Sequence, residues 1–251
     1  MTSVLRFSAS AAVLFIAALS FSARAQAPAQ GMTEWENEAL KLRLFYPSDL
    51  VQGDKARVMQ DGHLALFGIN GAADPKLAEA TRCLRPLLLL ELPKSAAPQA
   101  TSAQPSADGG TQVTVTATAA AEVLLAELDV ECLIAEHESA STTLLDEMAE
   151  IVNKVPGMKS IAQPATYTIG WQKVHMAAAQ GQPPAAANSQ PPSVSQLYTM
   201  GLSTNWNSHL LVWYFSSNSI DTLNRITKTT VRFGRDQAAP LYPLSIGNAT
   251  P

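Results

Sequence analysis

The stretch 197–233, LYTMGLSTNWNSHLLVWYFSSNSIDTLNRITKTTVRF, decides the fold that this chain is expected to adopt. Residues 209–215 form a continuous apolar and aromatic run. The length of this run and its bulky side chains favour a central strand buried on both faces over a helix. An earlier apolar segment and the polar residues 203–208 precede it. Two strands separated by a polar turn predict a hairpin.

A short helix is expected directly after this hairpin. Residues 216–219 supply side chains that cap a helix N-terminus, and Asp221 lies where the helix dipole favours a carboxylate. The apolar side chains recur every third residue, so one stripe faces inward: Ile220, Leu223 and Ile226. Residues 229–233 are β-branched and end at Gly234, which predicts a short closing strand. The unit is therefore strand, turn, strand, helix, short strand.

Residues 1–25 have the pattern of a secretory signal peptide. Arg6 gives the positive region, residues 11–19 the apolar region, and Ala-Arg-Ala at 23–25 the cleavage site. The mature chain is expected to begin near Gln26. The apolar run is too short to span a membrane. The expected location is periplasmic or secreted; the alternative is an uncleaved N-terminal anchor.

The charge composition limits the classes of partner. The formal net charge is −4, and only 15% of the residues are charged. The chain has no run of Lys and Arg, which argues against nucleic acid and anionic membranes as partners. We expect a monomer, without a membrane span after signal cleavage, that binds an unknown protein or small ligand.

The two cysteines predict one disulfide, Cys83 to Cys132, because exported proteins retain such bonds. The bond would close a loop of 49 positions. The chain-entropy model gives such a cross-link about 4 kcal/mol of stabilisation. The alternative is a pair of buried free thiols.

The predicted domain organisation is a single α/β domain over residues 38–234. A flexible segment, 26–37, precedes it and a tail, 235–251, follows. Two low-complexity polar insertions, 94–111 and 178–195, are expected to be flexible, because they bury too little apolar surface to become ordered.

The remaining elements are predicted from apolar runs that end at turn residues. The expected strands are 40–44, 84–92, 121–130, 165–169 and 171–177, with a further hairpin of 56–59 and 63–68 across Asp61-Gly62. The expected helices are 74–80 and the longer 144–155, which ends at Pro156-Gly157. The segment 121–130 is ambiguous, since its Ala and Leu suit a helix, but the strand is preferred.

Several of these segments resemble a known family. The motifs are Phe-Tyr-Pro-Ser-Asp-Leu at 45–50, Ile-Gly-Trp-Gln-Lys-Val at 169–174, Leu-Val-Trp-Tyr-Phe at 211–215 leading through a capped helix, and Val-Arg-Phe at 231–233. Their order is similar to the PsbP-like α/β/α sandwich and covers most of 38–234. The resemblance implies an α+β fold in which an antiparallel β-sheet carries helices on its faces.

The PsbP-like family includes the extrinsic P protein of photosystem II, a Ran-binding import factor and many bacterial exported proteins. Its known members act as accessory, assembly or binding proteins. The resemblance therefore implies an exported, non-enzymatic binding or accessory protein of the bacterial cell envelope. It carries no site residue over to this chain.

No catalytic constellation is visible in the sequence. The four histidines lie far apart, without the spacing of a metal site: His63, His137, His175 and His209. Nucleophile-elbow and glycine-rich phosphate motifs are absent from the sequence. We therefore predict no catalytic residue, no metal ligand and no cofactor. The alternatives are an exported hydrolase or metal-dependent enzyme with an unrecognised site, and an envelope assembly or structural factor.

One turn is a candidate interface. Trp206 lies between Asn205 and Asn207, and an aromatic residue in a turn often anchors a protein partner. The alternative, which we prefer, is that this tryptophan folds back onto its own domain. Trp213 is expected in the core because of its apolar neighbours.

Overall fold

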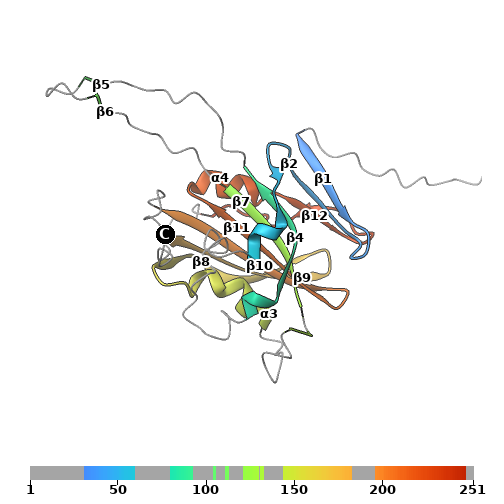
Figure 1. Ribbon diagram of the computed structural model, residues 1–251. Helices are drawn as coiled ribbons and strands as arrows, with labels where there is room; N and C mark the ends of the chain where they lie inside the picture. The colour runs from blue at the N-terminus through green and yellow to red at the C-terminus, as the bar shows by residue number, and fades with distance from the viewer. Residues whose placement is uncertain are drawn as a thin grey trace, which may run out of the picture.

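The computed structural model describes residues 31–59, 80–92, 104–105, 111–112, 121–129, 131–132, 144–182 and 196–246 (Figure 1). Several predictions lie outside these residues: the signal peptide at 1–25, the hairpin across Asp61-Gly62, nearly all of the 74–80 helix, and most of the 94–111 insertion. Of that insertion, β5 (Gln104–Pro105) is described, and it pairs with β6 (Thr111–Gln112).

The main layer is an antiparallel sheet of seven described strands, in the order β3-β4-β7-β11-β10-β9-β8. Their bounds are β3 (Val51–Gln52), β4 (Leu84–Glu91), β7 (Ala121–Leu128), β11 (His209–Ser217), β10 (Leu197–Trp206), β9 (Gln172–Gly181) and β8 (Met158–Ile169). The predicted strands 84–92, 121–130, 165–169 and 171–177 are confirmed, although β8 and β9 are longer than expected.

The predicted central strand is β11, the middle of the sheet. Its side chains alternate between two cores: Leu211, Trp213 and Phe215 face one, and Val212 and Tyr214 face the other. All five are fully buried. Asn207 and Ser208 have φ angles of 50° and 67°, the left-handed pair that a tight two-residue hairpin turn requires. The hairpin prediction for 197–217 is therefore confirmed.

One face of the large sheet is covered by helical segments. These are η1 (Lys55–Met59), η3 (Thr81–Cys83), α3 (Leu144–Glu150) and η4 (Ile151–Asn153). The phenol of Tyr214 donates a hydrogen bond of 2.9 Å to the carbonyl of Met148 and ties α3 to the sheet centre. The predicted 144–155 helix is present at the correct place but tightens into a 3₁₀ turn, and 55–59 is a 3₁₀ helix rather than a hairpin strand.

Helix α3 lies so close to β10 that a glycine is required there. A Cβ atom at Gly201 would lie 2.3 Å from the carbonyl oxygen of Ala149. We therefore expect Gly201→Ala to lower the free energy of unfolding by about 1–3 kcal/mol, because helix or strand must shift. Urea denaturation measures the change. Gly53→Ala is the matched control, since a Cβ atom there would meet the side chains of Glu91 and Leu89 and no backbone atom. Equal losses at both positions would contradict the close-approach argument.

The other face of the large sheet is covered by a second sheet and one helix. The second sheet has the order β1-β2-β12-β13 and is antiparallel. Its strands are β1 (Met32–Asn37), β2 (Leu42–Pro47), β12 (Thr230–Phe233) and β13 (Ala239–Pro240), and the helix is α4 (Ile220–Ile226). Figure 1 shows the blue β1–β2 hairpin and β12 to one side of the large sheet and α3 at the other.

The prediction for the end of the 197–233 unit is confirmed in its local detail. The hydroxyl of Ser219 caps α4 by accepting a hydrogen bond from the backbone N–H of Thr222. Leu223 and Ile226 face the core. The closing strand β12 leaves the large sheet and pairs with β2, so that Val231 lies opposite Leu44.

Three predicted boundaries are corrected. Residues 32–37 of the expected flexible segment 26–37 form β1, because they pair in regular register with β2. Residues 178–181 of the expected flexible loop 178–195 belong to β9, where Ala178 and Ala179 are buried opposite β10. The expected tail 235–251 contributes β13 and three core side chains: Leu241, Tyr242 and Ile246.

The fold class is corrected in part. The α+β, mostly antiparallel character is present, but the structure is dominated by sheets, with two short α-helices whose bounds lie within the described residues. The expected α/β/α sandwich needs helices on both faces of one sheet. Here a second sheet takes most of one face, because Leu42, Leu44 and Phe233 present an apolar surface to Trp213.

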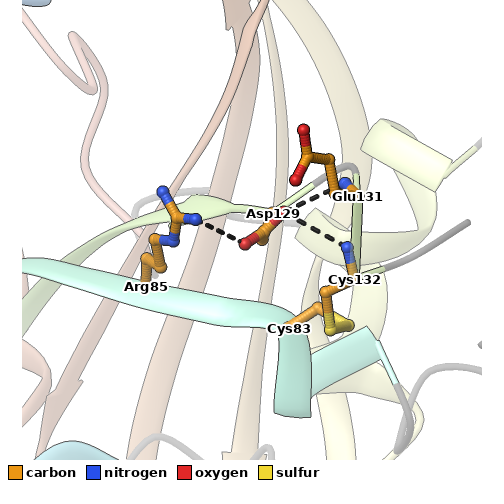
Figure 2. The surroundings of a disulfide bond; sticks show 5 residues. All are labelled: Cys83, Arg85, Asp129, Glu131 and Cys132. Atoms are coloured by element: carbon orange, nitrogen blue, oxygen red, sulfur yellow. Dashed lines mark hydrogen bonds and ion pairs between the residues drawn. A yellow bond between two sulfur atoms is a disulfide. The ribbon is translucent and has the colours of Figure 1, made fainter. Parts of the chain in front are cut away.

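The predicted disulfide joins Cys83 to Cys132, with 5.5 Å between the Cα atoms (Figure 2). Asp129 organises its surroundings: the carboxylate accepts hydrogen bonds from the backbone N–H groups of Glu131 and Cys132 and forms a 2.7 Å ion pair with Arg85. The N–H of Cys132 and the charge of Arg85 lower the pKa of the Asp129 carboxyl below its ordinary value. The disulfide is consistent with an oxidising, exported location. The described helices include none long and apolar enough to cross a membrane.

Candidate anion-binding site

The structure agrees with the preferred alternative for Trp206 and not with an exposed contact. Its side chain is only 6% exposed, its indole N–H donates a 2.6 Å hydrogen bond to the carbonyl of Leu40, and its ring lies 5.1 Å from that of Phe233. The tryptophan therefore folds back onto the domain. Asn205 and Asn207 are exposed on the turn, and their role at an interface stays a prediction.

A small cluster around His175 has the composition of a catalytic relay but not its geometry. The Nδ1 atom of His175 lies 2.5 Å from a carboxylate oxygen of Asp146 and 3.0 Å from the hydroxyl of Thr166. A relay needs the nucleophile and the orienting carboxylate on opposite ring nitrogens. Both partners here use the same nitrogen, so this arrangement does not activate Thr166. The adjoining depression is only about 110 Å³.

The other predicted histidine positions form no shared site. His209 makes a separate 2.6 Å pair with Glu127, and His63 and His137 lie outside the described residues. Across the described ranges, no group of three or more His, Cys, Asp or Glu residues is placed to hold a metal ion.

The second sheet carries a larger hollow on its outer face. The hollow has a volume of about 400 Å³, and we call it the basic pocket. It is lined by Glu36, Glu38, Lys41, Arg43, Arg232, Gly234 and Arg235. The strand pleat explains its charged lining, because side chains alternate between the two faces of a strand. Since Leu42 and Leu44 face the core, Arg43 between them must face outward.

The strand register aligns three charged residues across this outer face. Glu36 lies opposite Arg43 on β2, and Arg43 lies opposite Arg232 on β12. Arg43 is held by two carboxylates, at 3.2 Å from Glu34 and 2.7 Å from Glu36. Two like charges directly opposite each other destabilise a sheet. An anion placed between Arg43 and Arg232 would relieve this repulsion.

Positive charge is in excess within the basic pocket. Four cationic side chains line it against two carboxylates, and cations still outnumber carboxylates when Glu34 is counted. Within the described part of the chain, Lys41, Arg232 and Arg235 make no ion pair. The excess is notable in a chain of net charge −4.

Arg232, which lines this pocket, has one unsatisfied donor. Its Nε atom is buried from solvent and has no hydrogen-bond acceptor among the described residues. Leaving a buried donor of a charged group unpaired costs more than leaving a neutral one. Unpaired buried donors are rare enough to need a specific reason. This atom is closed to solvent, so an anion in the pocket would reach it only after a change of the Arg232 side-chain rotamer.

The rim of the pocket is fixed by the backbone. Lys41 adopts a left-handed conformation with φ of 52°, and the N–H of Gly234 donates a 2.8 Å hydrogen bond to the carbonyl of Lys41. Gly234 has φ of 59°. The β1–β2 turn and the end of β12 are thereby joined, and Lys41 and Arg235 stand on the same rim.

Sequence reasoning did not find this pocket. The alternation in 42–47 and 230–233 places Arg43 and Arg232 on outward positions, and this signal was readable. The pairing of the two strands was not readable, since they are far apart in the chain.

The fold and this surface define a sheet-rich α+β domain with a basic pocket on its smaller sheet. No protein-family model matches the chain, and neither does any curated protein. Among solved structures, the chain is similar to the solution structure of cyanobacterial PsbP (CyanoP) from Synechocystis sp. PCC 6803. The alignment covers 78% of this chain and 85% of that chain, with 8% identity and a TM-score of 0.35. This is a weak structural neighbour with a PsbP-like fold.

Proposed function

We propose that this chain is an exported, non-enzymatic binding or accessory protein of the bacterial cell envelope, and that it holds an anionic ligand in the basic pocket. The pattern of residues 1–25 and the Cys83–Cys132 disulfide support export. The observation that carries the ligand class is the position of Arg232 directly opposite Arg43, in a pocket where cationic side chains outnumber carboxylates.

The chemistry of arginine defines which anions fit. A guanidinium presents Nε–H and Nη–H donors in a fixed fork that matches the two oxygens of a carboxylate or phosphate. Lys41 and Arg235 add charge without a fixed geometry. A volume of about 400 Å³ lies within the range of small-molecule sites. Because the pocket is on the outer face of a sheet, we expect its affinity to fall as salt rises.

The test uses inorganic phosphate and citrate as probes in isothermal titration calorimetry. We expect the wild-type protein to bind at least one of them, and Arg232→Gln to weaken that binding about tenfold, since a charge-assisted hydrogen bond is removed. Arg57→Gln is the control: it removes the same charge away from the pocket, where Arg57 pairs with Glu91. Absence of binding to both probes, or equal effects of the two variants, would overturn the proposal.

A further inference from the structure

Trp171 is a large aromatic side chain that the fold leaves in solvent. It lies in the turn between β8 and β9, after Gly170, whose φ is 60°. Its side chain is 71% exposed. An exposed indole leaves a large apolar surface in contact with water. Trp171 belongs to neither of the two core clusters.

The exposed ring is nevertheless held in one orientation. Its indole N–H donates a 2.8 Å hydrogen bond to a carboxylate oxygen of Asp236. The ring also makes an edge contact with Trp206, with centroids 6.2 Å apart and planes at 66°. A ring fixed in this way loses little conformational entropy when a ligand covers it. Trp171 is therefore a preorganised platform.

The platform and the basic pocket are both open to solvent and lie close together in space. Gly234 and Arg235 line the pocket, and Asp236, which holds Trp171, is the next residue. Two trans peptide units separate the Cα atoms of Gly234 and Asp236 by at most about 7.6 Å. A Cβ atom at Gly234 would lie 3.3 Å from the ring of Trp206, which in turn contacts Trp171.

We infer that this surface binds an acidic oligosaccharide, with a sugar ring on Trp171 and a uronate carboxylate in the basic pocket. The inference rests on the proposed function. A sugar ring offers an apolar C–H face to an indole, and its carboxylate suits the fork of Arg232. Its hydroxyl groups need acceptors, which Glu36 and Glu38 supply in the pocket. These carboxylates disfavour a long polyanion, such as nucleic acid.

The experiment uses four probes on the full mature chain: an oligogalacturonate trimer, the neutral trimer maltotriose, inorganic phosphate and adenosine monophosphate. Calorimetry gives the affinities, and tryptophan fluorescence reports on the exposed indole. We expect oligogalacturonate to bind at least tenfold more tightly than maltotriose. Trp171→Ala is expected to weaken the binding of oligogalacturonate about tenfold and to leave the binding of phosphate unchanged. Trp171→Phe, which keeps a ring face but loses the hydrogen bond to Asp236, is expected to lie between.

The controls separate this inference from the proposed function. Leu244→Ala removes an apolar side chain that is 67% exposed and does not line the pocket. It should change neither the oligogalacturonate affinity nor the phosphate affinity. Retention of oligogalacturonate affinity in both Trp171 variants would overturn the platform while the phosphate pocket stands. Absence of binding of both phosphate and citrate to the wild type would overturn the pocket itself. Tighter binding of adenosine monophosphate than of oligogalacturonate, dependent on Trp171, would overturn the sugar class.

Discussion

Replacing Cys83 and Cys132 together by alanine is expected to lower the free energy of unfolding by about 4 kcal/mol. The bond joins positions separated by 49 residues, so its loss returns a large amount of loop freedom to the unfolded chain. It also lies where two neighbouring strands meet: Cys83 precedes β4, and the N–H of Asp129, after β7, donates to the carbonyl of Cys83. Cys83 is itself buried at 2% exposure.

Urea denaturation in the presence and absence of a reducing agent separates the two parts of this effect. Oxidised and reduced wild-type protein differ only in the cross-link. Reduced wild type and the double alanine variant differ only in the packing of the cysteine side chains. We expect most of the loss in the first comparison. Equal urea midpoints for oxidised and reduced wild type would contradict the prediction.

The elements within 197–233 were predictable because the signals that define them are local. A continuous apolar run, a polar turn, a serine cap and a three-residue apolar spacing all act over a few positions. The segment 121–130 was ambiguous between helix and strand, and the preferred strand is the one observed, where eight residues form β7. The central place of β11 followed from its burial on both faces.

The second sheet was not predictable from such signals. Residues 230–233 were expected as a closing strand, and 40–44 as a first strand, but nothing local specifies that they pair with each other. Nor does MTEWEN at 32–37 predict a strand by itself, since its two apolar residues, Met32 and Trp35, do not follow a two-residue alternation. Its strand conformation depends on pairing with β2. The pocket depends on this long-range pairing. The same pairing forms the second sheet, which lies where the α/β/α sandwich would have placed helices alone.

The burial of Trp206 and the exposure of Trp171 have a simpler cause. Met200, Leu202 and Trp206 are separated by even numbers of residues on one strand, so they share a face. Met200 and Leu202 are core residues, and the alternation alone directs Trp206 inward. Its position at the last residue of the strand, rather than within the turn, was the missing information. Trp171 stands in the turn itself, where no pleat constrains it.

Trp206→Ala is expected to lower the free energy of unfolding by about 3–5 kcal/mol, the range for truncating a buried large aromatic side chain. The indole packs against Phe233 on β12, and its N–H bonds to the carbonyl of Leu40 before β2. It thereby joins the large sheet to two strands of the smaller one. Leaving the Leu40 carbonyl unpaired adds to the cost of the cavity.

Two further variants complete the test: one separates packing from hydrogen bonding at Trp206, and the other is an exposed tryptophan as control. Trp206→Phe retains a ring against Phe233 but removes the donor to Leu40, and about 1–3 kcal/mol should be lost. Trp171→Ala, which removes an indole that is 71% exposed, should cost less than about 1 kcal/mol. Urea denaturation measures all three. Equal losses for Trp206→Ala and Trp171→Ala would contradict the role of Trp206 in joining the two sheets. In that case the rim of the basic pocket at Gly234 would be held by its backbone hydrogen bond to Lys41, and not by the Trp206 ring.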